Sequence, residues 1–409
     1  MNNSLLYFTI LNEESKSLGF LKKVRSQCVA FEKLGHSVFL GILRNTEFVI
    51  YRVVKSEFER ESCFHFGRRM ASITNRASIL KRIKNQHVLS QIMRFTQEWC
   101  KKKEIDAVYI RRFALSHLVM RFLRTLSRQC KIIWEYPTYP WTSEYRLSHT
   151  LPRSILERSF ASILERHVDL IVGVSGVSGF ERQGVLLTTN GVGVDELTVR
   201  KTPYLHRTVE LLGLGKITSY HGYDRIIKGI ADYKGEYKVI FNIAGDGNEI
   251  ENLRKLVHSL NVDESVKFHG VVDGKRLDDL FDKSHIGIGS LALQKIGGQY
   301  PSPLKHREFC ARGLPFVHAT DDPDFTGLEP YVKKVEYGED PIDIDELVTM
   351  AIEIYNGPDD GRIILRDHAV KALDWAVKMK PISDFILEAS HDSVKRTRSR
   401  LLSKRLRSS

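Results

Sequence analysis

Residues 302–317 carry charged and polar side chains at a spacing suited to binding a phosphate. They read SPLKHREFCARGLPFV, which we interpret as a helix followed by a buried strand. Ser302 is expected to cap the helix, Pro303 to open it and Gly313 to end it. The start of a helix gathers unpaired N–H groups and the positive end of the dipole, which together bind phosphate. Lys305 would add a positive charge in the first turn.

Glu308 follows Lys305 by three residues and therefore shares its helix face. A carboxylate accepts two hydroxyls well, and a ribose offers two. The stretch therefore predicts a site for a nucleoside diphosphate, with the diphosphate at the helix start and the ribose at Glu308. An ordinary amphipathic helix with Lys305 and Glu308 as a surface ion pair would show the same pattern, so this alternative stays open.

Length and composition indicate a globular protein of two domains. The chain has 409 residues, of which 42% are hydrophobic and 27% charged. No apolar run approaches the length that spans a membrane, and no basic region precedes the first apolar run, so we expect no secretory signal. The five cysteines are scattered without paired spacing. This pattern is typical of reduced thiols in the cytoplasm and predicts no zinc site.

The net charge of +12 is unevenly distributed. Residues 1–200 carry 31 Lys and Arg against 18 Asp and Glu, residues 201–394 carry 24 against 32, and residues 395–409 carry seven basic residues and no acidic one. Nucleic acid and an anionic lipid surface both fit this charge. No nucleic-acid-binding module is recognisable, so we expect no nucleic acid. The basic segment 52–103 should include an amphipathic helix, either simply solvated or facing a membrane.

Strands and helices alternate along the chain and then start again. A strand at 5–11, a helix at 20–34 and a strand at 38–43 form a βαβ opening. Turn signals at Asn190–Asp195 and a new strand at 209–214 place the domain boundary near 196–208. Further strands are predicted at 106–110, 131–134, 170–174, 185–189, 238–243, 266–271, 285–288 and from Phe316. The sequence therefore predicts an α/β protein with domains at 1–200 and 201–375.

The pattern Ser-Pro-Leu-Lys-x-x-Glu followed by Gly-x-Pro resembles the nucleotide-binding helix of glycosyltransferase family 4. Members of that family are retaining enzymes with the GT-B fold, two Rossmann-like domains whose parallel sheets face a central cleft. The resemblance implies that Ser302, Pro303, Leu304, Lys305 and Glu308 bind a nucleotide-sugar donor. It also implies that no metal is bound, and that a helix at about 376–394 returns to the first domain before a basic tail at 395–409.

The segment Gly215–Arg225, GKITSYHGYDR, resembles the donor-phosphate element of the family. Lys216 stands at an arginine position and His221 at a lysine position. Cations at this spacing would neutralise a departing diphosphate. His221 is a cation only if its pKa is raised, and Arg225 is expected to supply the missing charge; the alternative for Arg225 is a structural ion pair with Asp224.

The resemblance assigns residues of the remaining loops as well. Gly19, in the first loop, matches a glycine that approaches the donor, and Gly245 lies in a stretch that lines the nucleotide pocket. The loop that begins at Glu135, EYPTYP, is similar to one in polysaccharide-assembling members of the family. Arg112 and Glu135 are our acceptor-side candidates, although Glu135 could equally cap a neighbouring turn.

Three positions depart from the family pattern or suggest other chemistry. Pro137 stands where many members have a histidine, and Tyr300 stands where many have a sugar-binding glutamate. Either Gln299 or amides of the loop around Gly297 contact the sugar instead, or the choice of donor is unusual. Asp321–Asp324 could suggest a metal site, but this stretch follows a strand and its proline indicates a turn, so no metal is predicted there.

These observations predict a metal-independent, retaining glycosyltransferase for surface polysaccharide synthesis. Lys216, Lys305 and Glu308 are the predicted catalytic residues, the donor is a nucleotide sugar, and no cofactor is expected. The acceptor would be a glycan or a lipid-linked oligosaccharide, at the inner face of the cell membrane. A non-catalytic GT-B partner subunit and a sugar-nucleotide epimerase are the alternatives.

Overall fold

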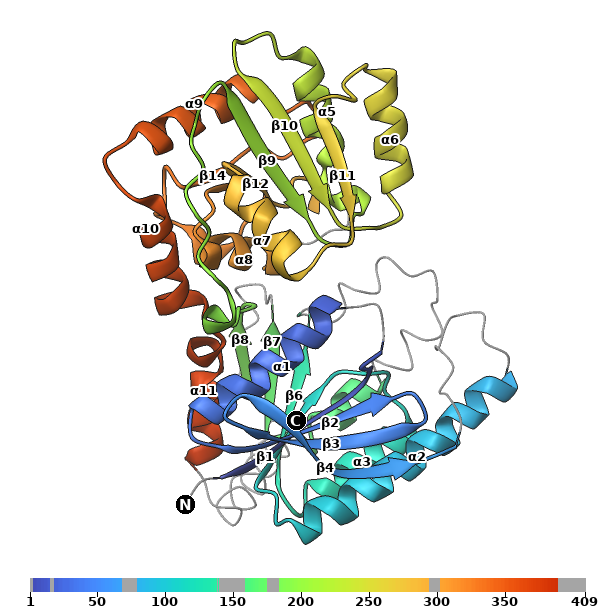
Figure 1. Cartoon of the computed structure of the whole chain (residues 1–409). Helices are drawn as coiled ribbons and strands as arrows, with labels where there is room; N and C mark the ends of the chain where they lie inside the picture. The colour runs from blue at the N-terminus through green and yellow to red at the C-terminus, as the bar shows by residue number, and fades with distance from the viewer. Residues whose placement is uncertain are drawn as a thin grey trace, which may run out of the picture. The chain divides into compact units, whose positions relative to one another are not determined.

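The computed structural model describes residues 3–14, 18–67, 79–137, 139, 159–174, 184–293 and 302–388. The chain divides into two compact units, Met1–Thr188 with Lys378–Ser409, and Thr189–Val377. Figure 1 shows that each unit is an α/β structure in which helices flank a sheet. Within the described residues, no helix is both long and apolar enough to cross a membrane.

The first unit is built on an eight-stranded sheet with the order β4-β3-β2-β1-β5-β6-β7-β8. Strands β1, β2 and β5 to β8 are parallel, whereas β3 and β4 continue the sheet as antiparallel strands. Its elements are β1 (Ser4–Asn12), α1 (Leu18–Lys33), β2 (Ser37–Arg44), β3 (Glu47–Val54), β4 (Glu57–His65), α2 (Ile79–Lys102), β5 (Ala107–Arg111), α3 (His117–Leu126), β6 (Lys131–Tyr136), β7 (Leu170–Val174) and β8 (Val185–Thr188).

The second unit has a six-stranded, wholly parallel sheet with the order β11-β10-β9-β12-β13-β14. Its strands and helices are β9 (Thr208–Leu214), α5 (Tyr223–Asp232), β10 (Lys238–Ala244), α6 (Ile250–Ser259), β11 (Val266–Gly270), α7 (Gly274–Lys283), β12 (Ile286–Ile288), α8 (Leu304–Arg312), β13 (Phe316–His318), β14 (Val332–Lys334), α9 (Ile344–Asn356) and α10 (Gly361–His368). Short helical turns are η2 (Val194–Glu196), η3 (Ser219–His221), η5 (Pro323–Phe325) and η6 (Ala369–Leu373).

The central parallel strands follow the pattern expected of a sheet covered on both faces. Strands β5, β6, β7 and β12 consist entirely of buried residues, because helices exclude water from both sides. The α/β fold predicted from the alternation of strands and helices is confirmed. The β3–β4 hairpin was not predicted, because its second strand is polar and partly exposed and therefore lacks a continuous apolar run.

The boundary between the two units comes at Thr189, earlier than the predicted boundary near 196–208. Residues after Thr189 attach to the second unit: the amide of Val194 donates to Asp374, and the backbone of Val192 pairs with Asp374. The chain returns to the first unit within α11 (Trp375–Leu387), where Ser383 hydrogen-bonds His36. The predicted tail at 395–409 lies outside the described residues.

Candidate functional site

Helix α8 begins and ends at the predicted places, but its cap differs from the prediction. Pro303 occupies the N-cap position with extended backbone, and no side chain caps the helix. The prediction that Ser302 is the cap is therefore wrong; its hydroxyl instead accepts a hydrogen bond from the backbone N–H of Asn190 at 3.0 Å. Gly313 adopts the left-handed conformation that ends the helix, with φ of 73°. The first N–H groups of α8 thus remain free of any side-chain cap.

Lys305 is the most informative side chain of this helix. It is only 8% exposed, and its Nζ donates to the hydroxyl of Tyr223 at 3.2 Å. Within the described part of the chain, no carboxylate lies within ion-pair distance of Lys305, so the predicted alternative of a surface pair with Glu308 is wrong. Burial holds the pKa of Lys305 well below its ordinary value. Because burial disfavours the charged form of a lysine, an anion bound beside Lys305 would stabilise its charge.

Two glycine loops at the carboxyl ends of β9 and β10 pack backbone to backbone. A side chain at Gly245, whose φ is +142°, would lie 1.9 Å from the carbonyl oxygen of Gly215, and one at Gly247 would lie 1.9 Å from that of Ile217. The N–H of Gly215 donates to Ala244 O at 3.0 Å. Only glycine permits this approach. Ligands of open parallel sheets bind at the carboxyl ends of the strands, which is where these loops lie.

His221 lies in the short helical turn η3, between β9 and α5, and it is not a cation. Burial, with a smaller contribution from the nearby charge of Lys305, lowers the pKa of His221 to about 2. Nδ1 lies 3.1 Å from the backbone N of Thr218, whose N–H donates to it if the single proton of the neutral ring is on Nε2, and 3.2 Å from the carbonyl oxygen of Thr218, which accepts if the proton is on Nδ1. The prediction of a positive charge at His221 is therefore wrong. This residue offers a neutral N–H donor instead.

Arg225 is structural rather than free for a ligand. Its guanidinium donates to three backbone carbonyls, those of Asp340 at 2.7 Å, Leu291 at 3.0 Å and Glu336 at 3.1 Å. The structure therefore corrects the prediction that Arg225 supplies charge to a diphosphate. The alternative of an ion pair with Asp224 is also wrong, because Asp224 pairs with Lys228 at 3.2 Å.

Lys216 and Glu308 retain accessible polar groups. Lys216 is exposed in the loop after β9. The carboxylate of Glu308 is partly exposed and accepts from Arg312 Nε at 3.1 Å, which leaves its other oxygen without a described protein donor. Arg312 is also held by Asp278 at 2.7 Å, so it fixes the orientation of Glu308.

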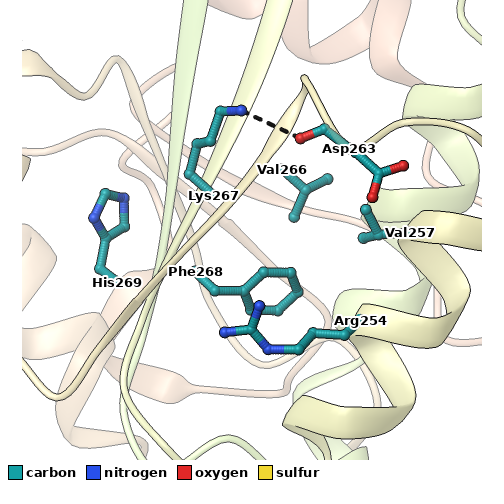
Figure 2. Close-up of a pocket in the computed structure, with 7 residues that line it drawn as sticks. All are labelled: Arg254, Val257, Asp263, Val266, Lys267, Phe268 and His269. Carbon is teal, nitrogen blue, oxygen red and sulfur yellow. Dashed lines mark hydrogen bonds between the residues drawn. The ribbon is translucent and has the colours of Figure 1, made fainter.

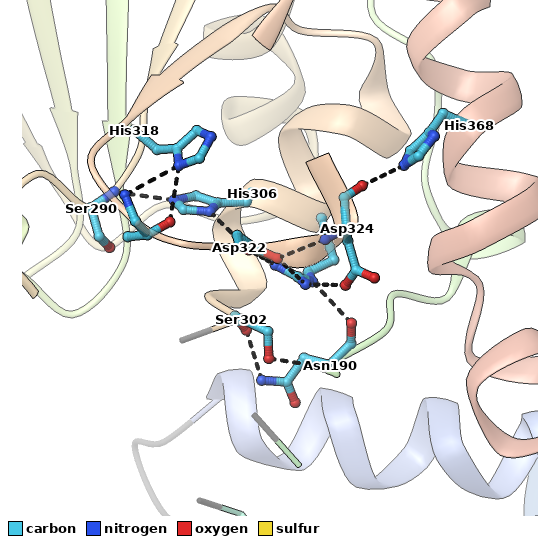
Figure 3. A network of polar contacts seen from close by, with 10 residues as sticks. Asn190, Ser290, Ser302, His306, His318, Asp322, Asp324 and His368 are labelled. Atoms are coloured by element: carbon cyan, nitrogen blue, oxygen red, sulfur yellow. Dashed lines mark hydrogen bonds and ion pairs between the residues drawn. The ribbon is translucent and has the colours of Figure 1, made fainter. Parts of the chain in front are cut away.

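A polar network under the start of α8 was not predicted from the sequence. Figure 3 shows Asn190 beneath Ser302, and Asp322 and Asp324 gathered beside the helix. Arg307, with no exposed side chain, makes a two-pronged contact with Asp322, contacts Asp324 and donates to Asn190 O at 2.9 Å. The side-chain amide of Asn190 donates to Ser302 O at 2.8 Å. This network fixes α8 to the segment after β8.

The same network explains why the acidic stretch Asp321–Asp324 needs no metal. Asp322 and Asp324 are engaged by Arg307, and Asp321 accepts from Lys334 at 2.5 Å. Burial alone would raise the pKa of Asp322, but the charge of Arg307 and hydrogen bonds from His306 and Arg307 hold it well below its ordinary value. Protein cations therefore neutralise these carboxylates. Metal independence of the protein as a whole stays a prediction.

In the first unit, Glu135 lies at the centre of a buried cluster. It is fully buried, and it contacts Lys23 Nζ at 3.3 Å, Arg111 at 3.1 Å, Tyr109 OH at 2.6 Å and Gln27 at 3.0 Å. Burial would raise the pKa of Glu135, but these cations and hydrogen bonds lower it to about 2. Direct contact with an acceptor is therefore not supported; Glu135 holds Lys23 and Arg111 in place.

Arg112 and Gly19 have more open surroundings. Arg112 follows β5, and its guanidinium lies 5.5 Å from the ring centre of Tyr136. Gly19 is exposed in the first turn of α1, with open space where a side chain would be. Their acceptor and donor roles stay predictions. Gln299, Tyr300 and the loop around Gly297 lie outside the described residues.

A hollow of about 440 Å³ opens beside the edge strand β11, but it contains none of the predicted donor residues. Figure 2 shows the guanidinium of Arg254 over the ring of Phe268, with Lys267 turned toward Asp263. The remaining lining residues are Val257, Val266 and His269. The charged groups here point to protein partners rather than converging on a common point, so the hollow is not the candidate site.

Comparisons with known proteins give a family match for part of the chain. Residues 200–319 match the family model described as "Glycosyl transferases group 1", and these residues include both glycine loops and α8. The comparison with curated proteins found no match.

Solved structures share the fold of the whole chain. Sucrose-phosphate synthase from Thermosynechococcus elongatus is 15% identical with a TM-score of 0.60, a glycosyltransferase from Rickettsia africae 13% with 0.58, and Anabaena HepE in complex with UDP 12% with 0.57. Each comparison covers 95% of this chain and 100% of the other. The protein therefore has the GT-B fold, and its residues 200–319 match the glycosyl transferases group 1 model.

Proposed function

We propose that the protein transfers a sugar from a nucleotide-sugar donor with retention of configuration. The observation that carries this proposal is Lys305, a buried lysine without a carboxylate partner in the described chain, next to the uncapped start of α8. Such a place favours an anion, because the helix start supplies N–H donors and the lysine supplies charge. The family match over the same residues supports a glycosyl donor.

In this proposal the second unit holds the donor through its own residues. The diphosphate lies at the N–H groups of Leu304 and Lys305, with Lys216 from the loop after β9 as a second cation. Gly215 and Gly245 let the backbone approach the nucleotide closely. Glu308 accepts the ribose hydroxyls, and the Nε2–H of His221 donates to a donor oxygen. Retention would follow from attack on the same face of the sugar that the diphosphate leaves, with the leaving phosphate as base.

These groups lower the barrier by stabilising charge that develops on the leaving group. As the bond to the sugar breaks, negative charge grows on the diphosphate. Donors fixed in advance, in a place that excludes water, stabilise that charge without having to reorganise. No metal is needed for this step if Lys216 and Lys305 supply the positive charge.

The acceptor is proposed to be a glycan or a lipid-linked oligosaccharide that is bound by the first unit, with Arg112 among its contacts. Surface polysaccharide synthesis at the inner face of the cell membrane would provide such an acceptor. The uneven charge of the sequence supports this location, since the first 200 residues and the tail are basic.

A panel of nucleotide sugars tests the proposal by thermal stabilisation of the full chain. A ligand that binds only the folded protein stabilises it by about 2.7 kcal/mol at one hundred times its dissociation constant. We expect one nucleotide sugar to raise the melting temperature strongly and then to release its nucleoside diphosphate slowly, as water takes the sugar in place of the acceptor. Stabilisation without release of the nucleoside diphosphate would favour the non-catalytic partner. A change of configuration at one carbon of the sugar, without transfer of the sugar to an acceptor, would favour the epimerase. No stabilisation by any member of the panel would contradict the proposal.

A further inference from the structure

A thiol, an imidazole and a carboxylate meet on the β3–β4 hairpin of the first unit. Cys63 and His65 are two residues apart on β4, so their side chains lie on the same face of the sheet. Glu47, on β3, is the cross-strand partner of His65. The register of the hairpin therefore brings together three side chains that each bind transition metals.

The separations between these groups fit a metal site. Cys63 Sγ lies 3.5 Å from His65 Nε2, whereas Glu47 Oε2 lies 3.3 Å from the other ring nitrogen, Nδ1. One metal ion would bind only one of these two nitrogens, and the other contact describes how the ring is held without metal. One ligand atom from each of the three residues can be chosen so that all lie within 4.8 Å of one another. With Zn–S of about 2.3 Å and Zn–N of about 2.0–2.1 Å, tetrahedral zinc separates its sulfur and nitrogen ligands by about 3.5 Å.

We propose that Cys63, His65 and Glu47 bind a divalent transition metal of the zinc type, with one coordination position left for water. Thiolate and imidazole ligands select zinc over magnesium or calcium, which prefer oxygen. This inference departs from the sequence-based expectation of no zinc site, which stays untested. That expectation relied on paired cysteine spacing, whereas this set combines a Cys-x-His pair with a carboxylate from the preceding strand. The proposal is independent of the proposed glycosyl transfer.

Arg60 competes with the metal for the carboxylate. Its guanidinium donates to Glu47 Oε2 at 2.6 Å and also lies beside Cys63. The Arg60 side chain is 46% exposed, so it can turn outward into water when a cation displaces it. The His65 side chain is 68% exposed, so its ring can turn into the position that a metal requires once its contacts with Cys63 and Glu47 are exchanged for the metal. The site is therefore open to exchange with solution rather than sealed in the core.

Cys63 gives the site a selective experimental signal. It is the one cysteine of the five that is not buried. Burial raises the pKa of the other four thiols, Cys28, Cys100, Cys130 and Cys310, which keeps them protonated and unreactive. A thiolate signal from the folded protein therefore reports on Cys63 alone.

The test is a titration of the untagged, reduced, chelator-treated full chain with Co²⁺, followed by absorbance. We expect a thiolate-to-cobalt charge-transfer band in the near ultraviolet, which Zn²⁺ abolishes by displacement and Mg²⁺ leaves unchanged. Cys63→Ser should remove the band, and His65→Ala and Glu47→Gln should each weaken binding at least fivefold. Arg60→Ala should bind more tightly. His87→Ala, which removes an exposed histidine on α2, is the matched control and should match the wild type.

A thiol-modifying reagent supplies a second measurement that does not depend on spectroscopy. We expect one fast-reacting thiol per folded chain, which Zn²⁺ protects and Mg²⁺ does not. Circular dichroism of each variant confirms that it is folded. A wild-type chain without a charge-transfer band, a band that persists in Cys63→Ser, weaker binding in Arg60→Ala, or a fast thiol that Zn²⁺ fails to protect would overturn the site.

Discussion

Lys305 is the residue on which the donor site depends most, and its protonation should change when the donor binds. Burial lowers its pKa in the free protein, whereas an adjacent diphosphate would raise it. Between these two pKa values, binding takes up a proton, so donor affinity should fall as the pH rises. Neither His221, which stays neutral, nor Tyr223, whose pKa is raised by burial, would take up this proton.

Calorimetry of the nucleotide sugar in buffers of different ionisation enthalpy measures this uptake directly. The diphosphate of a nucleotide sugar does not itself titrate near neutral pH, so it adds no proton of its own. Lys305→Gln should bind more weakly and take up no proton. Identical heats in all buffers at every pH tested would contradict this linkage between donor binding and the protonation of Lys305.

Glu308 is expected to set affinity for the ribose rather than stability. Glu308→Gln should weaken donor binding by about 1–3 kcal/mol, the range for hydrogen bonds to a charged group. The fold should be unaffected, because Glu308 is partly exposed. Glu346→Gln, which changes the exposed partner of Lys333, is the control. Donor affinity that is unchanged in Glu308→Gln would remove this residue from the site.

At the scale of elements, the contact between the two glycine loops should tolerate no side chain. Gly245→Ala would place a methyl group 1.9 Å from Gly215 O on a backbone with φ of +142°. We expect a loss of roughly 1–3 kcal/mol of stability, the range for strained backbone, together with weaker donor binding as the loops separate. Gly338→Ala, whose nearest described neighbour would be 3.6 Å away, should change neither. Denaturant unfolding and calorimetry measure both effects, and equal behaviour of the two variants would contradict the role of the loops.

The elements that could be predicted are those with strong local signals. The start and end of helix α8 could be predicted from Pro303 and Gly313. The central strands could be predicted from their continuous apolar runs. The N-cap could not be predicted correctly, because Ser302 finds a partner in Asn190, which is distant in sequence. The polar strand β4 has no apolar run, so the hairpin was missed.

Within the site, residue types were easier to predict than their partners. Lys305 stands out by its place at a helix start. The three carbonyls that hold Arg225 come from segments far along the chain, and burial rather than sequence decides that His221 is neutral. The Arg307 network forms because Asp322 and Asn190, which are distant in the sequence, both contact Arg307, and no local pattern indicates this.

At the scale of the whole molecule, the charge distribution predicts binding to an anionic membrane. Each Lys or Arg near such a surface contributes about 1 kcal/mol, screened over a Debye length of about 8–10 Å. Residues 395–409 add seven basic residues to a chain whose first 200 residues are already basic. We expect the full chain to sediment with anionic but not neutral liposomes, to be released by high salt, and to bind better than a version ending at Ser393. Equal sedimentation with both lipids, or with neither, would show that the tail only solubilises the protein.

The central claim is that the start of α8, together with Lys216 and Lys305, holds the departing diphosphate. The rate at which the diphosphate is released tests this claim. We would follow release of nucleoside diphosphate from the stabilising nucleotide sugar as its sugar is transferred to water, at saturating donor, in the wild type and in Lys216→Ala and Lys305→Ala. Both variants should be slower by more than tenfold, because both lose charge that stabilises the transition state. Lys228→Ala, which removes a surface lysine paired with Asp224, should keep the wild-type rate. Wild-type rates in Lys216→Ala and Lys305→Ala would contradict the account.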